Sequence, residues 1–454
     1  MICKVLLCEL SVFKYIFVVF LMSCSSQTPD QAFDLGVAKD TRTSKDTGKD
    51  SSTDVTTKDS GQDLGVKDAN MGDGGKSDAT SDVSMDVTTD LTMDADVSEP
   101  ECEYPATRVW VAEEVQGDNM APAFLSDIVD PVFGTTITRI TNGGEYQHYS
   151  KTQPWNADAS LIFMGNGRHV IVDATSFVVL NKPNSPTGER RWSTQEPDKM
   201  FHLGGTQFMT YSPSQDMDSL LYDFANEGCE VIRLGPWEGN LSIDDKKVAF
   251  ACKVGADLKV IVYDIENASI QARRTFPGMW GDANLDWLSV SQSGKYVVMN
   301  WRNMGMRSYD AETMNDQKML AGAGEHGDLC VDENGKDVYV QVICGGHPDR
   351  GEAGIMSYDV ETGTKTTLLP NAYTCTGHIS CRNYRRPGWA YVSSNYHHEA
   401  FAVKLDGSRK VQGFAHMHQK GGFEPFAVPS PDGCKMMFAS DWAGQDAAYV
   451  SIKK

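Results

Sequence analysis

Histidine is the residue type whose placement in this chain most strongly suggests chemistry. All ten histidines lie beyond residue 147, and five of them stand shortly before recurring units of strand and turn. These five are His148, His326, His378, His416 and His418. If the units are equivalent members of a structural repeat, their histidines converge in space. Converging imidazoles can exchange protons near neutral pH or bind a divalent metal ion.

The sequence His416-Met-His418 has the sharpest local geometry of this set. Because the two histidines are two residues apart on a strand, their imidazoles share one face and lie about 7 Å apart. With His378 from a neighbouring repeat they would form a site for one divalent ion, Mn²⁺ or Ca²⁺. The alternative is an exposed strand end whose histidines only form hydrogen bonds.

The repeat that must position these histidines has an apolar approach, a polar turn such as Ser-Pro-Asp-Gly and an alternating apolar strand. Glycine accepts the positive φ that such hairpin turns require. Seven copies follow one another, mostly about 40–50 residues apart, which is the period of a propeller blade. One four-stranded sheet cannot cover both of its faces, so blades pack in a ring. The sequence therefore predicts an all-β fold, a seven-bladed β-propeller over residues 104–454, with copies of the unit at residues 155–163, 211–222, 241–250, 290–299, 331–340, 381–392 and 428–438.

A second pattern supports this interpretation. The pairs Tyr263-Asp264, Tyr309-Asp310 and Tyr358-Asp359 each end an apolar run and precede a polar stretch. We expect each pair to lie where a later strand of a blade enters its turn.

Residues 15–24 follow a basic start and form a short apolar run. The run is too short for a comfortable transmembrane helix and has the flanks of an export signal. Its end, Leu21-Met22-Ser23-Cys24, resembles the lipobox of bacterial lipoprotein signal peptides. The resemblance implies a signal peptide over residues 1–23, a lipid on Cys24 and a place in the cell envelope, with Ser25 indicating the outer membrane. The lipid would then be the only contact with the membrane.

The acidic residues are unevenly placed along the chain. The formal net charge is −21 and the pI is about 4.8, which excludes a general role in binding nucleic acid. Between Asp34 and Glu103 there is no aromatic residue, and Asp, Ser, Thr and Lys dominate. Such a segment cannot bury enough apolar surface to offset its ordering entropy. We therefore expect residues 24–103 to be a disordered tether.

Eleven cysteines are present. Once the export signal is removed and Cys24 is lipidated, an even number remains, which an exported protein can pair as disulfides. The sequence does not choose among the connectivities, although Cys375 and Cys381 are close enough to bridge a loop. No pair has the spacing of a zinc finger.

The Ser-Pro-Asp-Gly repeats, the late His-x-His at residues 416–418 and the earlier Gly377-His378 are similar to oligogalacturonate lyase. That family is a seven-bladed propeller that cleaves pectin fragments by β-elimination. The resemblance implies that His378, His416 and His418 are Mn²⁺ ligands. The family also has a glutamine just before its His-x-His, whereas Gln412 stands one residue out of register.

The stretch His-Tyr-Ser-Lys-Thr-Gln-Pro-Trp-Asn-Ala-Asp that begins at His148 resembles the propeller ulvan lyases. In those enzymes a second histidine follows about one strand pair later, and a tyrosine and an arginine lie further downstream. The resemblance implies catalytic roles for His148, His169, Tyr222 and Arg233, with Tyr211 as the other candidate tyrosine.

β-Elimination from a uronate removes a weakly acidic proton beside a carboxylate. A metal ion or an arginine must neutralise that carboxylate, and groups such as His or Tyr must transfer the protons. Arg382 offers positive charge, and Trp155 offers an aromatic face for a sugar ring; ordinary surface charge and core packing are their alternatives. The expected partner is therefore an anionic polysaccharide or oligosaccharide, bound by a monomer.

Two other functions stay open at this point. The repeats are shared with TolB-like propellers, which bind a protein or glycan partner without catalysis. A glycoside hydrolase would need paired carboxylates, and the sequence does not pair Asp158, Asp282 and Asp328. The chain contains no Gly-x-Ser-x-Gly elbow, P-loop, dinucleotide fingerprint or His-Glu-x-x-His motif.

Overall fold

The computed structural model describes residues 120–165, 169–182, 189–236, 238–322, 326–343, 353–370, 377–395, 397–420 and 424–453. The predicted signal peptide, Cys24 and the predicted tether lie outside these residues. Within them, none of the helical structure is long and apolar enough to span a bilayer. The one helix among the described residues is a short 3-10 helix, η1 (Phe224–Glu227).

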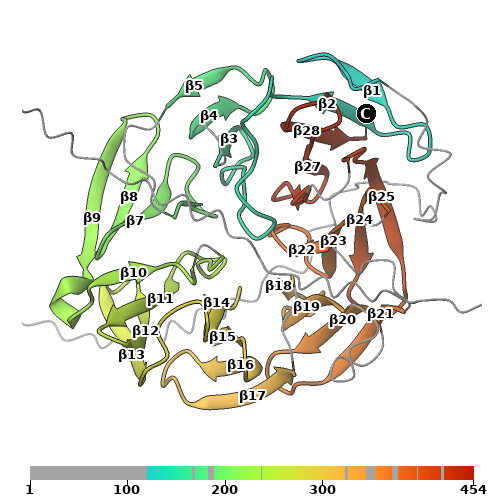
Figure 1. The fold of residues 1–454 in the computed structure, drawn as a ribbon. Helices are drawn as coiled ribbons and strands as arrows, with labels where there is room; N and C mark the ends of the chain where they lie inside the picture. Colours follow the sequence, from blue (N-terminus) through green and yellow to red (C-terminus); the bar gives the residue numbers. More distant parts are fainter. Residues whose placement is uncertain are drawn as a thin grey trace, which may run out of the picture. The chain divides into compact units, whose positions relative to one another are not determined.

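The described strands form seven antiparallel sheets arranged in a ring (Figure 1). Each sheet is one blade. In blades 2 to 6 the strands follow the chain outward from the centre to the rim. The prediction of an all-β, seven-bladed β-propeller is confirmed.

Blades 1 to 3 come first along the chain. In blade 1, Trp155 bridges to Ile162 in place of an innermost strand. The strands of these blades are β3 (Leu161–Met164), β4 (Val170–Asp173) and β5 (Val179–Asn181) in blade 1; β6 (Arg191–Trp192), β7 (Met200–Gly204), β8 (Gln207–Ser212) and β9 (Met217–Asp223) in blade 2; and β10 (Val231–Arg233), β11 (Lys247–Val254), β12 (Asp257–Asp264) and β13 (Ser269–Phe276) in blade 3.

Blades 4 to 6 each contain four strands in chain order. They are β14 (Leu285–Val290), β15 (Tyr296–Trp301), β16 (Gly305–Asp310) and β17 (Asp316–Ala321) in blade 4; β18 (Asp328–Val331), β19 (Asp337–Ile343), β20 (Gly354–Asp359) and β21 (Lys365–Pro370) in blade 5; and β22 (Gly377–Ser380), β23 (Trp389–Ser394), β24 (Glu399–Lys404) and β25 (Val411–His416) in blade 6.

Blade 7 is built from both ends of the described region. β26 (Val428–Pro429), β27 (Lys435–Ser440) and β28 (Ala447–Ile452) form its inner part. β2 (Thr136–Arg139) pairs with β28, and β1 (Asp127–Val129) adds a fifth strand at the rim. The ring is therefore closed by hydrogen bonds between an early strand and the last one.

Burial along each strand follows from the packing of blade against blade. Residues 248–252 of β11 are all buried because both faces of this inner strand meet neighbouring blades, whereas the rim strand β13 is partly exposed along its length. Apolar clusters fill the space between blades. One of them joins Trp287 of blade 4 to Tyr339 of blade 5.

Most of the predicted repeat units lie at the turn between the innermost and second strands. The unit at residues 211–222 does not, because it spans the turn between β8 and β9, the third and fourth strands of blade 2. The polar residues of this unit resemble those of the turns between first and second strands. In blade 2 the turn between the first and second strands is formed by residues 193–199. The Tyr-Asp pairs end β12, β16 and β20, as predicted.

Two disulfides are described. Cys229 pairs with Cys252 within blade 3, and Cys330 of β18 pairs with Cys381, which directly follows β22 of blade 6. The short spacing of Cys375 and Cys381 suggested a disulfide between them, but Cys381 is instead joined to Cys330.

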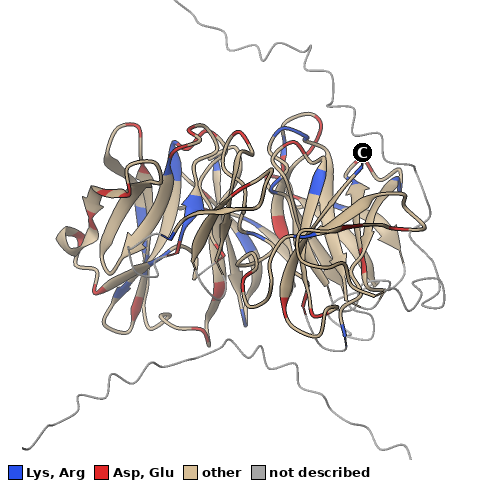
Figure 2. Ribbon diagram, turned by 90° about the horizontal axis from the view of Figure 1, so that it is seen from above, with Lys and Arg blue, Asp and Glu red and all other residues tan. Residues whose placement is uncertain are grey.

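The strands run between two faces of the ring, which Figure 2 shows edge-on. We call the face where the innermost strands begin the N-terminal face. The face where these strands turn into the second strands is the C-terminal face. The two faces carry different chemistry.

Candidate functional site

The segment of residues 147–153 lies at the centre of the ring and contacts several blades. The Gln147 amide donates to the Pro425 carbonyl (2.9 Å), and the Gln153 amide donates to the carbonyls of Arg382 (2.7 Å) and Pro429 (3.1 Å). Both glutamines are buried, so these bonds fix the two ends of the segment. The side chains between them are presented at the axis of the propeller.

Tyr149 is the centre of a cluster that we call the axial group, which comprises Tyr149, His326, His378 and Phe426. The Tyr149 hydroxyl oxygen lies 3.3 Å from Nδ1 of His326. The ring centroids of His326 and His378 are 4.4 Å apart, and Tyr149 and Phe426 each contact His378 edge-on, at 5.1 and 4.9 Å. Blades 1, 5, 6 and 7 therefore each contribute one ring to the group.

The members of the axial group differ in exposure. His326 is exposed, Tyr149 is half-buried, and His378 is almost completely buried. Neither ring nitrogen of His378 has a hydrogen-bond partner among the described residues. His326 and the Tyr149 hydroxyl are thus the parts of this group that a ligand can reach.

Electrostatics keep both imidazoles neutral and the phenol protonated at neutral pH. Although His326 is exposed at the surface, its neighbours displace water from the ring, and this desolvation and then the charge of Lys151 lower the pKa of His326. Burial, His326 and Lys151 hold the pKa of His378 well below its usual range. Burial and the carboxylates of Glu238 and Glu424 raise the pKa of Tyr149. The pair therefore contains a proton donor, Tyr149, beside a proton acceptor, His326.

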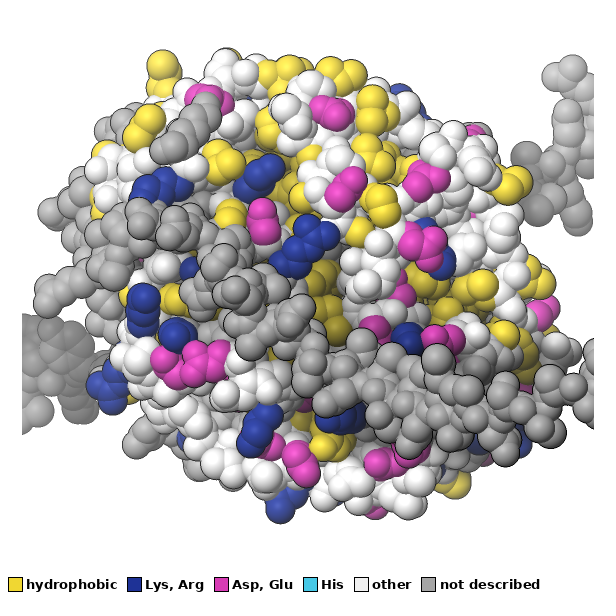
Figure 3. All heavy atoms as spheres, turned by 180° about the vertical axis from the view of Figure 1, so that it is seen from behind, with side chains coloured by type: hydrophobic (Ala, Val, Ile, Leu, Met, Phe, Trp, Pro, Cys, Tyr) yellow, Lys and Arg dark blue, Asp and Glu magenta, His cyan; other side chains and the backbone are white. Residues whose placement is uncertain are grey.

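Two ion pairs with buried cations lie beside the axial group. The Lys151 ammonium donates to the Glu238 carboxylate and lies 4.0 Å from the centroid of the Trp287 ring. The Arg382 guanidinium donates two hydrogen bonds to the Asp328 carboxylate, from Nε at 3.1 Å and from Nη2 at 3.0 Å. Charges of both signs also lie around the centre of the face drawn in Figure 3.

His148 directs its side chain toward a second cluster, in which His169 and two arginines lie. A Cβ on Gly165 would stand 2.7 Å from the Cβ of His148, so the glycine lets His148 pack against the end of β3. Burial, the charge of Arg191 and the charge of His169 lower the pKa of His148 to about 4. Burial and the charge of Arg190 lower the pKa of His169. The structure therefore brings His148 and His169 together, both as neutral imidazoles near pH 7.

The predicted metal ligands are not brought together. His378 lies on β22, the innermost strand of blade 6, and His416 ends β25, the outermost strand of the same blade. Three strand spacings of about 4.8 Å separate them by roughly 14 Å. Among the described residues no group of three His, Cys, Asp or Glu side chains is placed to hold a metal ion. The set His378, His416 and His418 therefore does not fit a manganese ion.

His416 has other partners instead. Its Nδ1 lies 2.9 Å from the Asp130 carboxylate and its Nε2 lies 3.5 Å from Glu399, and all three side chains are fully buried. Burial alone would lower the pKa of His416, but the two carboxylates outweigh it and raise the pKa to about 9. His418 stacks on Trp442 at 3.9 Å, and burial and the charge of His416 lower its pKa to about 4. We interpret this cluster as structural.

The remaining predicted site residues are scattered. Tyr222 lies on β9 at the rim of blade 2, where its ring packs on Phe224 and Tyr263, so it is separated from His148. Arg233 lies on β10, the innermost strand of blade 3. The other candidate tyrosine, Tyr211, is buried and donates to Asp216.

The two predicted substrate contacts are buried. Trp155 has an exposed fraction of 0% and belongs to the apolar core around blade 1, so no ring face is left for a sugar. Arg382 is buried in an ion pair with Asp328, so its guanidinium does not face a substrate. For a glycoside hydrolase, two of the three candidate aspartates would have to face each other. Asp158 lies in the turn before β3 of blade 1, Asp282 precedes β14 of blade 4, and Asp328 is paired with Arg382.

Sequence reasoning missed Tyr149 and Lys151, although they stand one and three residues after His148. Their signal was available, because the stretch that begins at His148 precedes a repeat unit and carries several polar side chains. His326 was recognised only as one of five histidines that precede repeat units. The contact between His326 and His378 confirms that the histidines preceding the repeat units of blades 5 and 6 converge.

Comparison with solved structures identifies propellers of the same fold. An oligogalacturonate lyase from Vibrio parahaemolyticus matches with a TM-score of 0.53 and 11% identity, over 74% of this chain and 98% of that chain. An oligogalacturonate lyase in complex with manganese matches with a TM-score of 0.55 and 14% identity, over 74% of this chain and 97% of that chain. At this level of identity the similarity shows the fold alone. No protein-family model and no curated protein matches the sequence.

Proposed function

We propose that this protein is a polysaccharide lyase that cleaves uronate-containing glycans by β-elimination at the centre of its N-terminal face. The observation that carries the proposal is the convergence of Tyr149, His326 and His378 at the axis, with the Tyr149 hydroxyl 3.3 Å from His326. The fold similarity to oligogalacturonate lyases adds support for the reaction class, uronate β-elimination.

The chemistry assigns a role to each accessible group. A neutral imidazole, His326 or His148, removes the proton beside the uronate carboxylate, and the Tyr149 hydroxyl protonates the leaving glycosidic oxygen. Arg302 supplies the neutralising cation, and its charge lowers the pKa of His326. Arg302 is also paired with a carboxylate, Asp286 at 2.6 Å, but its side chain is 40% exposed, against 2% for Arg382, so a substrate can reach it. No step is assigned to a metal ion, because the predicted ligands do not converge.

The experiment is to incubate the purified protein with polygalacturonate and with ulvan, and to follow the ultraviolet absorbance of the unsaturated uronate product. Replacing a proton-transferring group lowers the rate by about 10²–10⁴-fold. We therefore expect such a loss in His326→Asn or in His148→Asn. His398→Asn is the matched control, because His398 has a φ of 55° and asparagine tolerates that conformation.

The second candidate is a non-catalytic propeller that binds a protein or glycan partner. The burial of Trp155 and Arg382 and the separation of the predicted metal ligands favour it, because they remove several groups that a lyase would use. Absence of product on both substrates, with protein that unfolds cooperatively, would make this the leading function.

We also propose that the protein is attached to a bacterial envelope by a lipid on Cys24, on the basis of residues 15–24. Cys24→Ser should then release the protein from the membrane fraction into the soluble fraction. Retention of the variant in the membrane fraction would contradict the proposal.

A further inference from the structure

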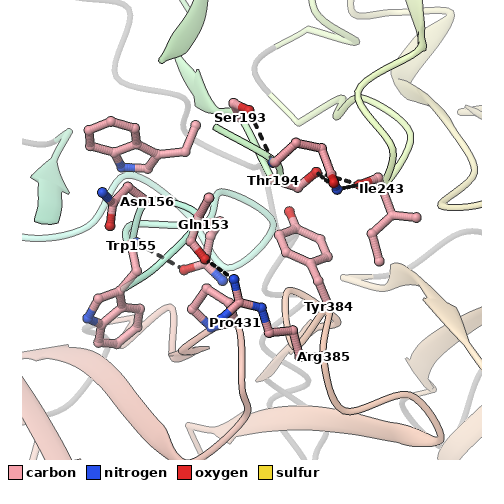
Figure 4. A pocket seen from close by; sticks show the side chains of 12 residues that line it. Gln153, Trp155, Asn156, Ser193, Thr194, Ile243, Tyr384, Arg385 and Pro431 are labelled. Carbon is pink, nitrogen blue, oxygen red and sulfur yellow. Dashed lines mark hydrogen bonds between the residues drawn. The ribbon is translucent and has the colours of Figure 1, made fainter. Parts of the chain in front are cut away.

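A cavity of about 200 Å³ opens on the C-terminal face, opposite the axial group. Its walls come from the segments that follow the innermost positions of blades 1, 2, 3, 6 and 7, and include Asn156, Thr194, Ile243, Tyr384, Arg385 and Pro431 (Figure 4). All of these residues lie in the described part of the chain. The cavity is smaller than the pockets of roughly 300–1,000 Å³ that hold drug-sized ligands, so only a small molecule would fit in it.

Hydrogen bonds hold the walls of the cavity in place. The Asn156 amide donates to the Pro197 carbonyl (2.9 Å) and its oxygen accepts from the Leu161 N–H (2.9 Å). The Gln195 amide donates to the Ile243 carbonyl (2.8 Å). The walls are therefore preformed, which lowers the cost of ordering a site around a ligand.

Arg385 and Tyr384 present donors that this scaffold does not use. Arg385 is exposed, and Nη2 donates to the Ala157 carbonyl at 2.5 Å; this is its guanidinium's one hydrogen bond to the described residues. The Tyr384 hydroxyl accepts from Nη1 of Arg382 at 3.4 Å, and its own hydrogen has no acceptor among the described residues. Two neighbouring residues thus direct a cation and a hydroxyl donor toward the same space, as Figure 4 shows for their side chains.

The surrounding groups select among anions. Asp245 is the carboxylate that faces this side, and Ser193, Thr194 and Gln195 donate to it. Burial raises the pKa of the Tyr384 phenol, Arg382 lowers it, and the charges of Asp328 and then of Asp245 raise it. A nearby carboxylate disfavours a doubly charged ligand, whereas Arg385 favours a single negative charge. Ile243, Pro431 and the Tyr384 ring add apolar contact for a compact ring.

We propose that this cavity binds a small carboxylate of the size of one sugar acid, with its carboxylate on Arg385 and Tyr384. A planar carboxylate suits the paired N–H groups of a guanidinium. The site is distinct from the axial group and does not depend on the proposed lyase activity, because binding alone is claimed. The ring would then carry one site on each face.

The test is isothermal titration calorimetry of the full chain with galacturonate and, separately, with galactose, which has the same ring without the carboxylate. We expect galacturonate to bind and galactose not to bind. Arg385→Ala should weaken galacturonate at least tenfold, and Tyr384→Phe should weaken it severalfold while keeping the ring. Arg307→Ala, on β16 of blade 4, is the control arginine and should bind like the natural protein.

Three results would overturn the proposal. The first is no binding of galacturonate, and the second is equal binding of galactose. The third is galacturonate binding that survives both Arg385→Ala and Tyr384→Phe but is lost in His148→Asn, which would assign the ligand to the opposite face. If Arg385→Ala fails to fold, Tyr384→Phe still tests the proposal, because this variant removes only a hydroxyl and should fold.

Discussion

The buried cluster of Asp130, His416 and Glu399 predicts an unusual dependence of stability on pH. Asp130 belongs to the turn between β1 and β2, where its carboxylate also accepts from the N–H groups of Val132 and Phe133. The same carboxylate accepts from both the main-chain N–H and the imidazole of His416, at 2.8 and 2.9 Å. The charged imidazole thus ties the rim of blade 6 to blade 7.

The size of the effect follows from the pKa values. The pKa of His416 is about 9 in the folded protein, against an ordinary value of 6.5. This difference corresponds to about 3 kcal/mol of folding free energy. Because the folded-state pKa is raised, the stabilisation is complete below pH 6.5 and disappears as pH rises through 9. The side chains are fully buried, so solvent does not screen the interaction between His416 and Asp130.

The assay is urea denaturation at pH 6 and at pH 9.5, followed by tryptophan fluorescence. The natural protein should lose about 3 kcal/mol more between these pH values than His416→Asn does. His418→Asn is the matched control, because the pKa of His418 is about 4 and its charge does not change over this range. If His416→Asn shows the same loss as the natural protein, the assignment of a charged, buried His416 is refuted.

Three further predictions test the placement of other residues. Trp155→Ala should cost about 3–5 kcal/mol of stability because the indole is fully buried, and an unchanged melting temperature would contradict its place in the core. Asp328→Asn should cost about 3–5 kcal/mol by leaving Arg382 buried without its carboxylate, whereas the double variant Asp328→Asn with Arg382→Met should lose less in the same urea titration. If His148 is the catalytic base, activity should fall as pH drops through about 4, and an acid limb near 6.5 in the pH–rate profile would exclude that role.

The fold was predictable because the turns of most blades are specified by the few residues that form them. Turns such as Ser-Pro-Asp-Gly at residues 430–433 need only short-range hydrogen bonds, for example from the Ser430 hydroxyl to Asp432, so their pattern survives in the sequence. Blade 2 shows the limit of this reasoning. Its outer turn at residues 212–216 has the same polar character as an inner turn, and local composition does not distinguish them.

The site was less predictable because its geometry depends on which strand of a blade carries each residue. Strand alternation does not place His418, because β25 ends at His416 and His418 has a φ of 50°; nor does the alternation reveal that β25 lies at the rim. Tyr149 meets His326 across 177 positions of sequence, a contact that spacing cannot disclose. His148 and His169 were paired by resemblance, and the structure places them together.

The pairing of β2 with β28 in blade 7 has a consequence for how the protein is made. Blades 1 to 6 are complete as soon as their own residues have been synthesised, but β2 must wait for the last described strand. Until then its hydrogen-bonding edge is open, and an open edge is where a partly folded chain joins another chain. The contact spans more than 300 residues, since Thr136 pairs with Ile452. Ring closure is therefore expected to be a late and slow step, which leaves the nascent protein most dependent on chaperones when its final blade is still missing.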